Sequence, residues 1–298
     1  ALLSLLTQPA TPAALRARGS AAVMSMLRAS ATWPTQRREV AAAVPRVIGA
    51  LWQLLVDEST ASIALCTLLH LATELPHSLR SHSQRLSAAI PPLVLSVDSH
   101  TAHAAAVLLG ALPRCAGKDA PDRWLRTVQQ LTGTLCELCV PLLGALSSRL
   151  CALPYALPTL DLGDSAALLS GTGGIGGAAR RERILSAARA VALGLAACLR
   201  PCALADGTPG PVPLPVEMLI EVSTWLISHD GGAPPPNPRD TALPAEIAIS
   251  ALPQLHLLGL QLATATLAAA RTHAMPHAIT LCDAVHLSLA RTGANSPA

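Results

Sequence analysis

The chain has 298 residues, of which 51% are hydrophobic, so it can bury a sizeable core and is not disordered as a whole. It contains no Phe and one Tyr, so Leu, Ala and Val must form most of that core, and this composition favours closely packed helices. The net charge of +3 is small, and the basic residues are scattered. With few aromatic side chains for base stacking, the composition argues against direct, sequence-specific nucleic-acid binding.

Apolar residues recur at helical spacing along nearly the whole chain, and no segment shows the alternation of a strand. In chain order, the pattern predicts helices at about residues 12–29, 36–57, 60–75, 78–97 and 100–112, a long helix that begins near residue 121, and helices at about 178–199, 215–228, 243–271 and 277–291. One face of the long helix is formed by Trp124, Val128, Leu131, Leu135, Leu138 and Leu142. Pro45, Pro91 and Pro92 are expected to break or kink their helices, because proline lacks the amide hydrogen that a helix interior needs.

A repeated pattern links several of these helices. The sequence LATELPHSLRSHSQRLSAAIPPL begins at Leu71, and LLGALPRCAGKDAPDRWLRTVQQL begins 37 residues later at Leu108. Each contains the end of one helix, a Leu-Pro stop, a polar turn and a second helix, and a looser copy begins at Leu260. A period of about 40 residues with two helices per unit is typical of HEAT and armadillo repeats. The predicted fold is therefore all-α, a HEAT/armadillo-like α-solenoid of stacked helix pairs.

Two stretches rich in Gly and Pro, residues 153–177 and 230–242, are predicted to be loops between helices. The first divides the predicted solenoid into an N-terminal part, residues 1–152, and a C-terminal part, residues 178–298. The uncharged stretch Ile247–Ala270 is long enough to span a bilayer. Pro253 and several polar residues interrupt it, so a buried helix is the preferred interpretation and no membrane association is expected.

The glycine-rich sequence LSGTGGIGG contains Gly171, Gly173 and Gly176 in the G-x-G-x-x-G spacing of a dinucleotide-binding turn. Such a turn follows a strand, and an acidic residue about 20 residues further on closes a second strand. Neither the strands nor the acidic residue is found here. The glycines are therefore interpreted as part of a linker, and no cofactor is expected.

Two groups of residues have some resemblance to metal or redox sites. Cys136 and Cys139 have the spacing of a zinc half-site or a redox pair, but no second pair with this spacing follows. The second group comprises His273, His277, Cys282 and His286. It lacks the glutamate of a zinc hydrolase helix, and Pro276 separates its first two members. Buried thiols and surface histidines are the preferred interpretations, so no catalytic, cofactor-binding or metal-binding residue is predicted.

The pattern Leu-x-x-Leu-Leu occurs three times in the first seventy residues. Its leucines are Leu2, Leu5 and Leu6, then Leu51, Leu54 and Leu55, and finally Leu65, Leu68 and Leu69. On a helix, this spacing places three leucines on one face, which suits docking into a groove on a partner. The same spacing is what the core of a leucine-rich solenoid requires. Core packing is the preferred interpretation of each copy, and partner docking is the alternative.

A longer stretch of the sequence resembles a known family. LHLATELPHSLRSHSQRLSAAIPPLVLSVDSHTAHAAAVLLGALPRCAGKDAPDRWLRTVQQLTGTLCELCVPLL is similar to the N-terminal domain of the Rix-type pre-rRNA-processing proteins, whose animal members are called proline-, glutamic acid- and leucine-rich protein. The segments VPLPVEMLIEVSTWLIS and ALPQLHLLGLQLATATLAAARTHAMPHAITL resemble later parts of that domain. The resemblance covers about residues 65–291, although Leu or Ala fills the positions where the family usually has aromatic residues.

The resemblance implies a non-catalytic scaffold of the nucleolus and nucleoplasm that acts in large ribosomal subunit biogenesis and pre-rRNA processing. The implied partners are a WD-repeat propeller protein, a second helical-repeat protein, the precursor large subunit and, through that particle, a large AAA remodelling ATPase. A generic HEAT-like adaptor in transport or signalling is the alternative function. A metal- or nucleotide-dependent enzyme is a more distant alternative.

Overall fold

The computed structural model describes residues 6, 8, 11–30, 33–143, 157–163, 176–200, 214–229 and 243–294. Within these ranges every regular element is a helix, and no strand is formed. The prediction of an all-α fold is therefore confirmed.

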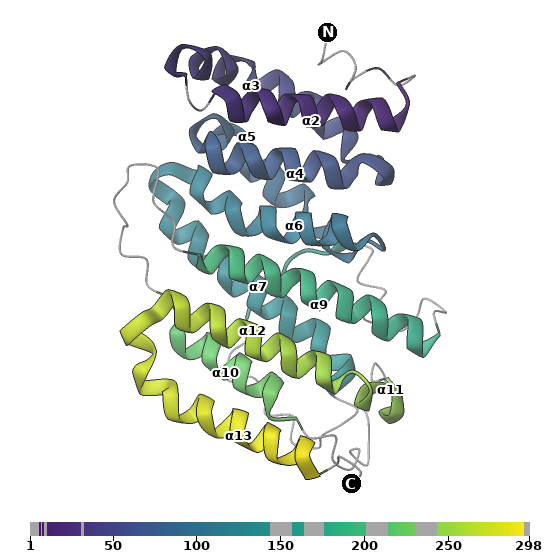
Figure 1. The fold of residues 1–298 in the computed structure, drawn as a ribbon, viewed down its shortest axis with the longest axis vertical. Coiled ribbons are helices and arrows are strands. Elements are labelled where there is room, and N and C mark those ends of the chain that lie inside the picture. The colour runs from purple at the N-terminus through teal and green to yellow at the C-terminus, as the bar shows by residue number, and fades with distance from the viewer. Residues whose placement is uncertain are drawn as a thin grey trace.

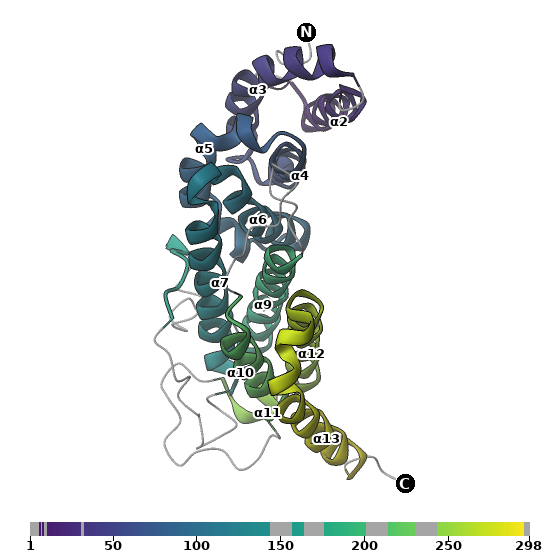
Figure 2. The same cartoon turned by 90° about the vertical axis from the view of Figure 1, so that its left-hand side faces the viewer.

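The helices form an elongated stack that is two layers deep (Figure 1). The front layer, which faces the viewer in Figure 1, consists of α2 (Ala13–Ser30), α4 (Glu58–Glu74), α6 (Ser99–Ala111), α9 (Gly177–Leu199) and α12 (Leu252–Ala270). Behind it lie α3 (Pro34–Leu54), α5 (Pro76–Ala89), α7 (Ala120–Leu143) and α10 (Val216–Ile227), and α13 (Ala278–Ala294) packs on α10 at the C-terminal end. Figure 2 shows that the stack curves, with the front layer on the concave side.

Short helical segments connect the longer helices: η1 (Pro91–Leu95), η2 (Leu112–Asp119), α11 (Ala245–Ile249) and η4 (Arg271–His277). The expected break at Pro91 and Pro92 is confirmed, because α5 ends at Ala89 and a 3-10 segment follows. At Pro45, where a break or a kink is expected, the helix is not broken, since α3 continues through this residue. Pro45 lies on the exposed side of the helix, where water can solvate the carbonyl group that has lost its amide partner.

The single helix expected over residues 243–271 is also wrong, because the chain turns at Ser250 and Ala251 and forms α11 and α12 instead. Pro253 lies in the first turn of α12, where its missing amide hydrogen costs no hydrogen bond, so the proline starts a helix there. In the described part of the chain, no helix is both long enough and apolar enough to cross a membrane.

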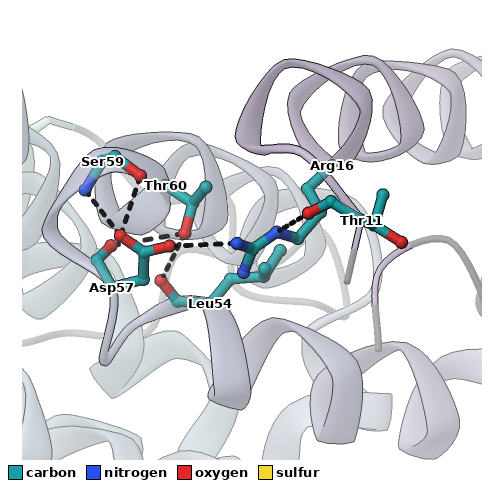
Figure 3. Close-up of polar contacts among 6 residues, drawn as sticks. All are labelled: Thr11, Arg16, Leu54, Asp57, Ser59 and Thr60. Atoms are coloured by element: carbon teal, nitrogen blue, oxygen red, sulfur yellow. Dashed lines mark hydrogen bonds and ion pairs between the residues drawn. The ribbon is translucent and has the colours of Figure 1, made fainter. Parts of the chain in front are cut away.

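One carboxylate fixes the junction of three helices near the N-terminal end (Figure 3). Asp57 caps α4, because its Oδ1 accepts hydrogen bonds from the hydroxyl group of Ser59 at 2.8 Å and from its backbone amide at 3.1 Å. These two bonds are the main reason that the pKa of Asp57 lies below its usual value. Its Oδ2 lies 3.2 Å from Nη2 of Arg16 on α2. Thr60 donates a hydrogen bond of 3.0 Å to the carbonyl oxygen of Leu54, so the start of α4 is also joined to the end of α3.

The core follows the leucine pattern of the sequence. The predicted face of α7 is confirmed for Val128, Leu131, Leu135, Leu138 and Leu142, which are all buried, while Trp124 is partly buried against the same core. Alanines fill much of the remaining interior, above all in α6 and α9. Small side chains leave little volume between helices, so the helix axes must come close together for the core to be filled.

The closest of these approaches joins α6 to α9. A Cβ atom added to Gly194 would lie 2.6 Å from the carbonyl oxygen of Ala106, and one added to Gly110 would overlap the carbonyl oxygen of Gly194. Beside this contact, the thiol of Cys198 donates to the carbonyl oxygen of Gly110 at 3.3 Å. The indole Nε1 of Trp124 on α7 donates to the carbonyl oxygen of Cys198 at 2.9 Å. Glycine is therefore required at both positions, and α7 is tied to the same junction.

We expect Gly194→Ala to lower the free energy of unfolding by about 1–3 kcal/mol, because the added methyl group overpacks the contact between α6 and α9. Urea unfolding followed by circular dichroism measures this change. The matched control is Gly49→Ala in α3, where nothing lies within 4 Å of the added Cβ atom. At that position, alanine should stabilise the protein by about 0.5–1 kcal/mol through its higher helix propensity. Equal effects of the two substitutions would contradict the close approach of α6 and α9.

Candidate interaction surface

The two cysteines with the C-x-x-C spacing are buried in α7. Burial raises the pKa of the Cys136 thiol to about 12 and also raises the pKa of Cys139. Metal-ligating and reactive cysteines act as thiolates, so this environment disfavours both roles. The two side chains pack as small hydrophobic groups in the core, as the sequence led us to expect.

The second group of candidate ligands is spread over two elements. His273 and His277 belong to η4, which contains Pro276, whereas Cys282 and His286 lie on α13. Among the residues that the structure describes, no three or more His, Cys, Asp or Glu side chains are placed to hold a metal ion together.

The glycine-rich stretch falls largely outside the described residues, which include neither Gly171 nor Gly173. Gly176 precedes the first turn of α9 with extended backbone angles. The next residue, Gly177, lies against α11, since a Cβ atom there would be 2.6 Å from Cδ1 of Ile247. This end of α9 is therefore used in helix packing.

The described leucines of the three Leu-x-x-Leu-Leu copies belong to the core. Leu6, Leu51, Leu54, Leu65 and Leu68 are at most 1% exposed. Leu55 and Leu69 are half-buried against the same core cluster, while Leu2 and Leu5 lie outside the described residues. A partner groove cannot reach the buried leucines in this conformation, so core packing accounts for them.

A different set of leucines is exposed on α9 and α12, two helices of the front layer. Leu257, Leu260 and Leu267 follow one another along α12 and are 53%, 39% and 38% exposed. Leu193 on α9 is 44% exposed. We call these four residues the leucine stripe. The helical pattern of the sequence did not separate them from core leucines, because α12 carries leucines on its buried side as well.

Contacts between α9 and α12 set the relative position of these leucines. Nη2 of Arg189 donates to the side-chain oxygen of Gln254 at 2.6 Å, and Arg181 donates to the hydroxyl group of Ser250 near the start of α12. The two helices therefore run in the same direction. Leu193 is one turn beyond Arg189, and Leu257 is about one turn beyond Gln254, so the two leucines lie at similar positions along the two parallel helix axes.

The same part of the concave surface has a basic character. Neither α6 nor α12 contains an acidic residue, although Asp98 caps the start of α6. The acidic residue within α9, Glu182, is paired with Nη2 of Arg181 at 2.5 Å. Arg189 is exposed and donates to the uncharged amide of Gln254, and no carboxylate among the described side chains neutralises it. His103 on α6 lies close enough to sense the charge of Arg189.

Two histidines of the front layer have lowered pKa values. Burial is the main cause for His103, and nearby His100 and Arg189 lower its pKa further, while Asp98 opposes the shift. Burial is also the main cause for His70 on α4, where Glu74 opposes the shift and Arg28 adds to it. Both imidazoles are therefore held in the neutral form more strongly than in an unfolded chain.

This predicts how stability depends on pH. Because the folded pKa values lie below the ordinary value of 6.5, the unfolded chain binds more protons as the pH falls through this value. The free energy of unfolding should thus decrease between pH 7 and pH 5. The double variant His70→Gln/His103→Gln should show a smaller decrease in urea unfolding at the same pH values. An unchanged slope in this variant would contradict the assignment to these two histidines.

No model of a protein family matches this chain, and no curated protein matches it. The similarity to the Rix-type proteins therefore rests only on the order of the helices in the quoted segments and on the Leu-Pro stops and turns between them.

Proposed function

We propose that the chain is a HEAT/armadillo-like α-solenoid that serves as a non-catalytic scaffold in a nuclear complex for large ribosomal subunit biogenesis and pre-rRNA processing. The curved stack with its long concave surface carries the scaffold part of this proposal (Figure 2). A surface of this kind can hold several partners side by side, and each partner then raises the effective concentration of the others.

The repeat found in the sequence coincides with the helix pairs, which supports the solenoid assignment. Leu75 and Pro76 lie at the end of α4, where α5 begins. Leu112 and Pro113, 37 residues later, follow α6 in the same way. The Leu-Pro stop thus occupies the same position in two successive units of the stack, as expected when each unit buries its apolar face against the next one.

The similarity to the Rix-type proteins supports the ribosomal part of the proposal. The partners it implies are a WD-repeat propeller protein, a second helical-repeat protein and the precursor large subunit, with the AAA remodelling ATPase reached through that particle. The nucleolus and nucleoplasm are the corresponding locations.

A generic HEAT-like adaptor in transport or signalling is the second candidate, favoured by the same concave surface. The two candidates differ in their partners, since an adaptor of that kind would not associate with ribosomal precursors. The raised pKa values of the buried thiols in α7 disfavour Cys136 and Cys139 as the ligands of a metal-dependent enzyme.

Purification of the tagged full-length protein from its own cells, followed by sucrose-gradient sedimentation, tests the proposal. We expect the protein to sediment with precursor large subunits and to bring down a WD-repeat protein. Depletion of the protein should lead to accumulation of unprocessed precursor rRNA. Sedimentation in light fractions together with unrelated partners would replace this function with the generic adaptor.

A further inference from the structure

The leucine stripe lies on a helix face that no described element covers. Leu257 and Leu267 are separated by ten residues of α12, a distance of about 15 Å along the helix axis. Leu193 of α9 widens the stripe, because it lies at a position along its helix axis similar to that of Leu257. Isolated exposed leucines are common on protein surfaces, whereas an aligned row of them is typical of an interaction site.

The charges beside the stripe limit the kind of partner that fits. Arg189 is one turn from Leu193, and its charge is not neutralised by a carboxylate among the described side chains. The nearby carboxylate of Asp98, at the start of α6, already accepts hydrogen bonds from the backbone amides of His100 and Thr101, and α12 carries no acidic residue. A carboxylate of a partner next to Arg189 would, in contrast, gain a charge-assisted hydrogen bond.

We propose that α9 and α12 bind an acidic amphipathic helix of a partner protein through the leucine stripe and Arg189. Apolar residues of the partner, spaced by three and four positions, pack on Leu257, Leu260 and Leu267. Carboxylates at the edge of that apolar face lie beside Arg189. This proposal rests on one part of the proposed function, namely that the chain is a binding protein. It concerns the chemistry of the partner and does not depend on the assembly that the chain joins.

The row of leucines favours a folded protein helix over nucleic acid as the occupant. Nucleic acid bound at a basic surface depends mainly on Lys and Arg contacts to phosphates and, for single strands, on aromatic stacking. The stripe contains no aromatic residue, and a phosphate backbone would not bury its exposed apolar area. Partner helices with matching leucines would bury that area.

Selection of helical peptides on the purified full chain tests this proposal. The probe is a display library of amphipathic helices with fixed leucines on one face and Glu, Gln or Lys allowed at the flanking positions. We expect helices with flanking Glu to be enriched over those with Lys. Enrichment of Lys, or equal enrichment on the wild type and on Leu257→Gln, would overturn the proposal.

Fluorescence anisotropy with a selected peptide then locates the site. Leu257→Gln should weaken binding at least tenfold, while the matched control Leu15→Gln, an exposed leucine on α2, should leave it within twofold. Arg189→Glu should weaken binding of the acidic peptide and strengthen binding of its Glu→Lys counterpart, and this exchange of specificity also demonstrates that the variant is folded. Equal losses in Leu257→Gln and Leu15→Gln would overturn the assignment to α12.

Competition with a single-stranded RNA oligonucleotide separates the two classes of partner. The RNA should not displace the peptide at physiological salt. Displacement that depends on Arg189 but not on Leu257 would overturn the proposal in favour of a nucleic-acid surface. Because these measurements use purified components, their failure would leave the sedimentation result for the ribosomal function unaffected.

Discussion

The close approach of α6 and α9 holds the two halves of the stack together. At this junction the backbone carbonyl oxygens of Ala106 and Gly194 occupy the space that side chains at Gly194 and Gly110 would need. Such an approach is possible only with glycine, and it lets small alanine side chains on both helices fill the interior without voids. Two hydrogen bonds fix the same junction: Cys198 of α9 donates to Gly110 of α6, and Trp124 of α7 donates to Cys198. Displacing α9 would therefore also displace α7 and the surface that α9 shares with α12.

This packing also determines what the concave surface offers. The inner sides of α6, α9 and α12 pack in the core, and their outer sides form one continuous face. The contact between Arg189 and Gln254 sets the position of α9 relative to α12 along the helix axes. An arginine without a carboxylate partner among the described side chains and a row of exposed leucines come together there. Each feature alone is common on protein surfaces, and their combination is what points to an acidic amphipathic partner.

The buried and exposed leucines show why a spacing pattern alone does not identify an interaction site. The Leu-x-x-Leu-Leu copies around Leu51 and Leu65 have the spacing of a docking motif, yet these leucines are fully buried. Leu257, Leu260 and Leu267 have a similar helical spacing and are exposed. The difference lies in the side of the helix on which the leucines lie. Leu65 and Leu68 lie on the buried side of α4, whereas Leu257, Leu260 and Leu267 lie on the exposed side of α12.

The sequence by itself determined the all-α class, the apolar face of α7 and the break at Pro91, because helical periodicity and proline act within a few residues of the chain. Two features depended on the surroundings of a proline. α3 continues through Pro45, whereas residues 243–271 are divided and Pro253 lies in the first turn of a new helix, α12. Only the tertiary structure decided that α6 meets α9 at two glycines and that Arg189 bonds to Gln254. These pairs are far apart in the chain, and their contact depends on how whole helices pack, which no local pattern of residues specifies.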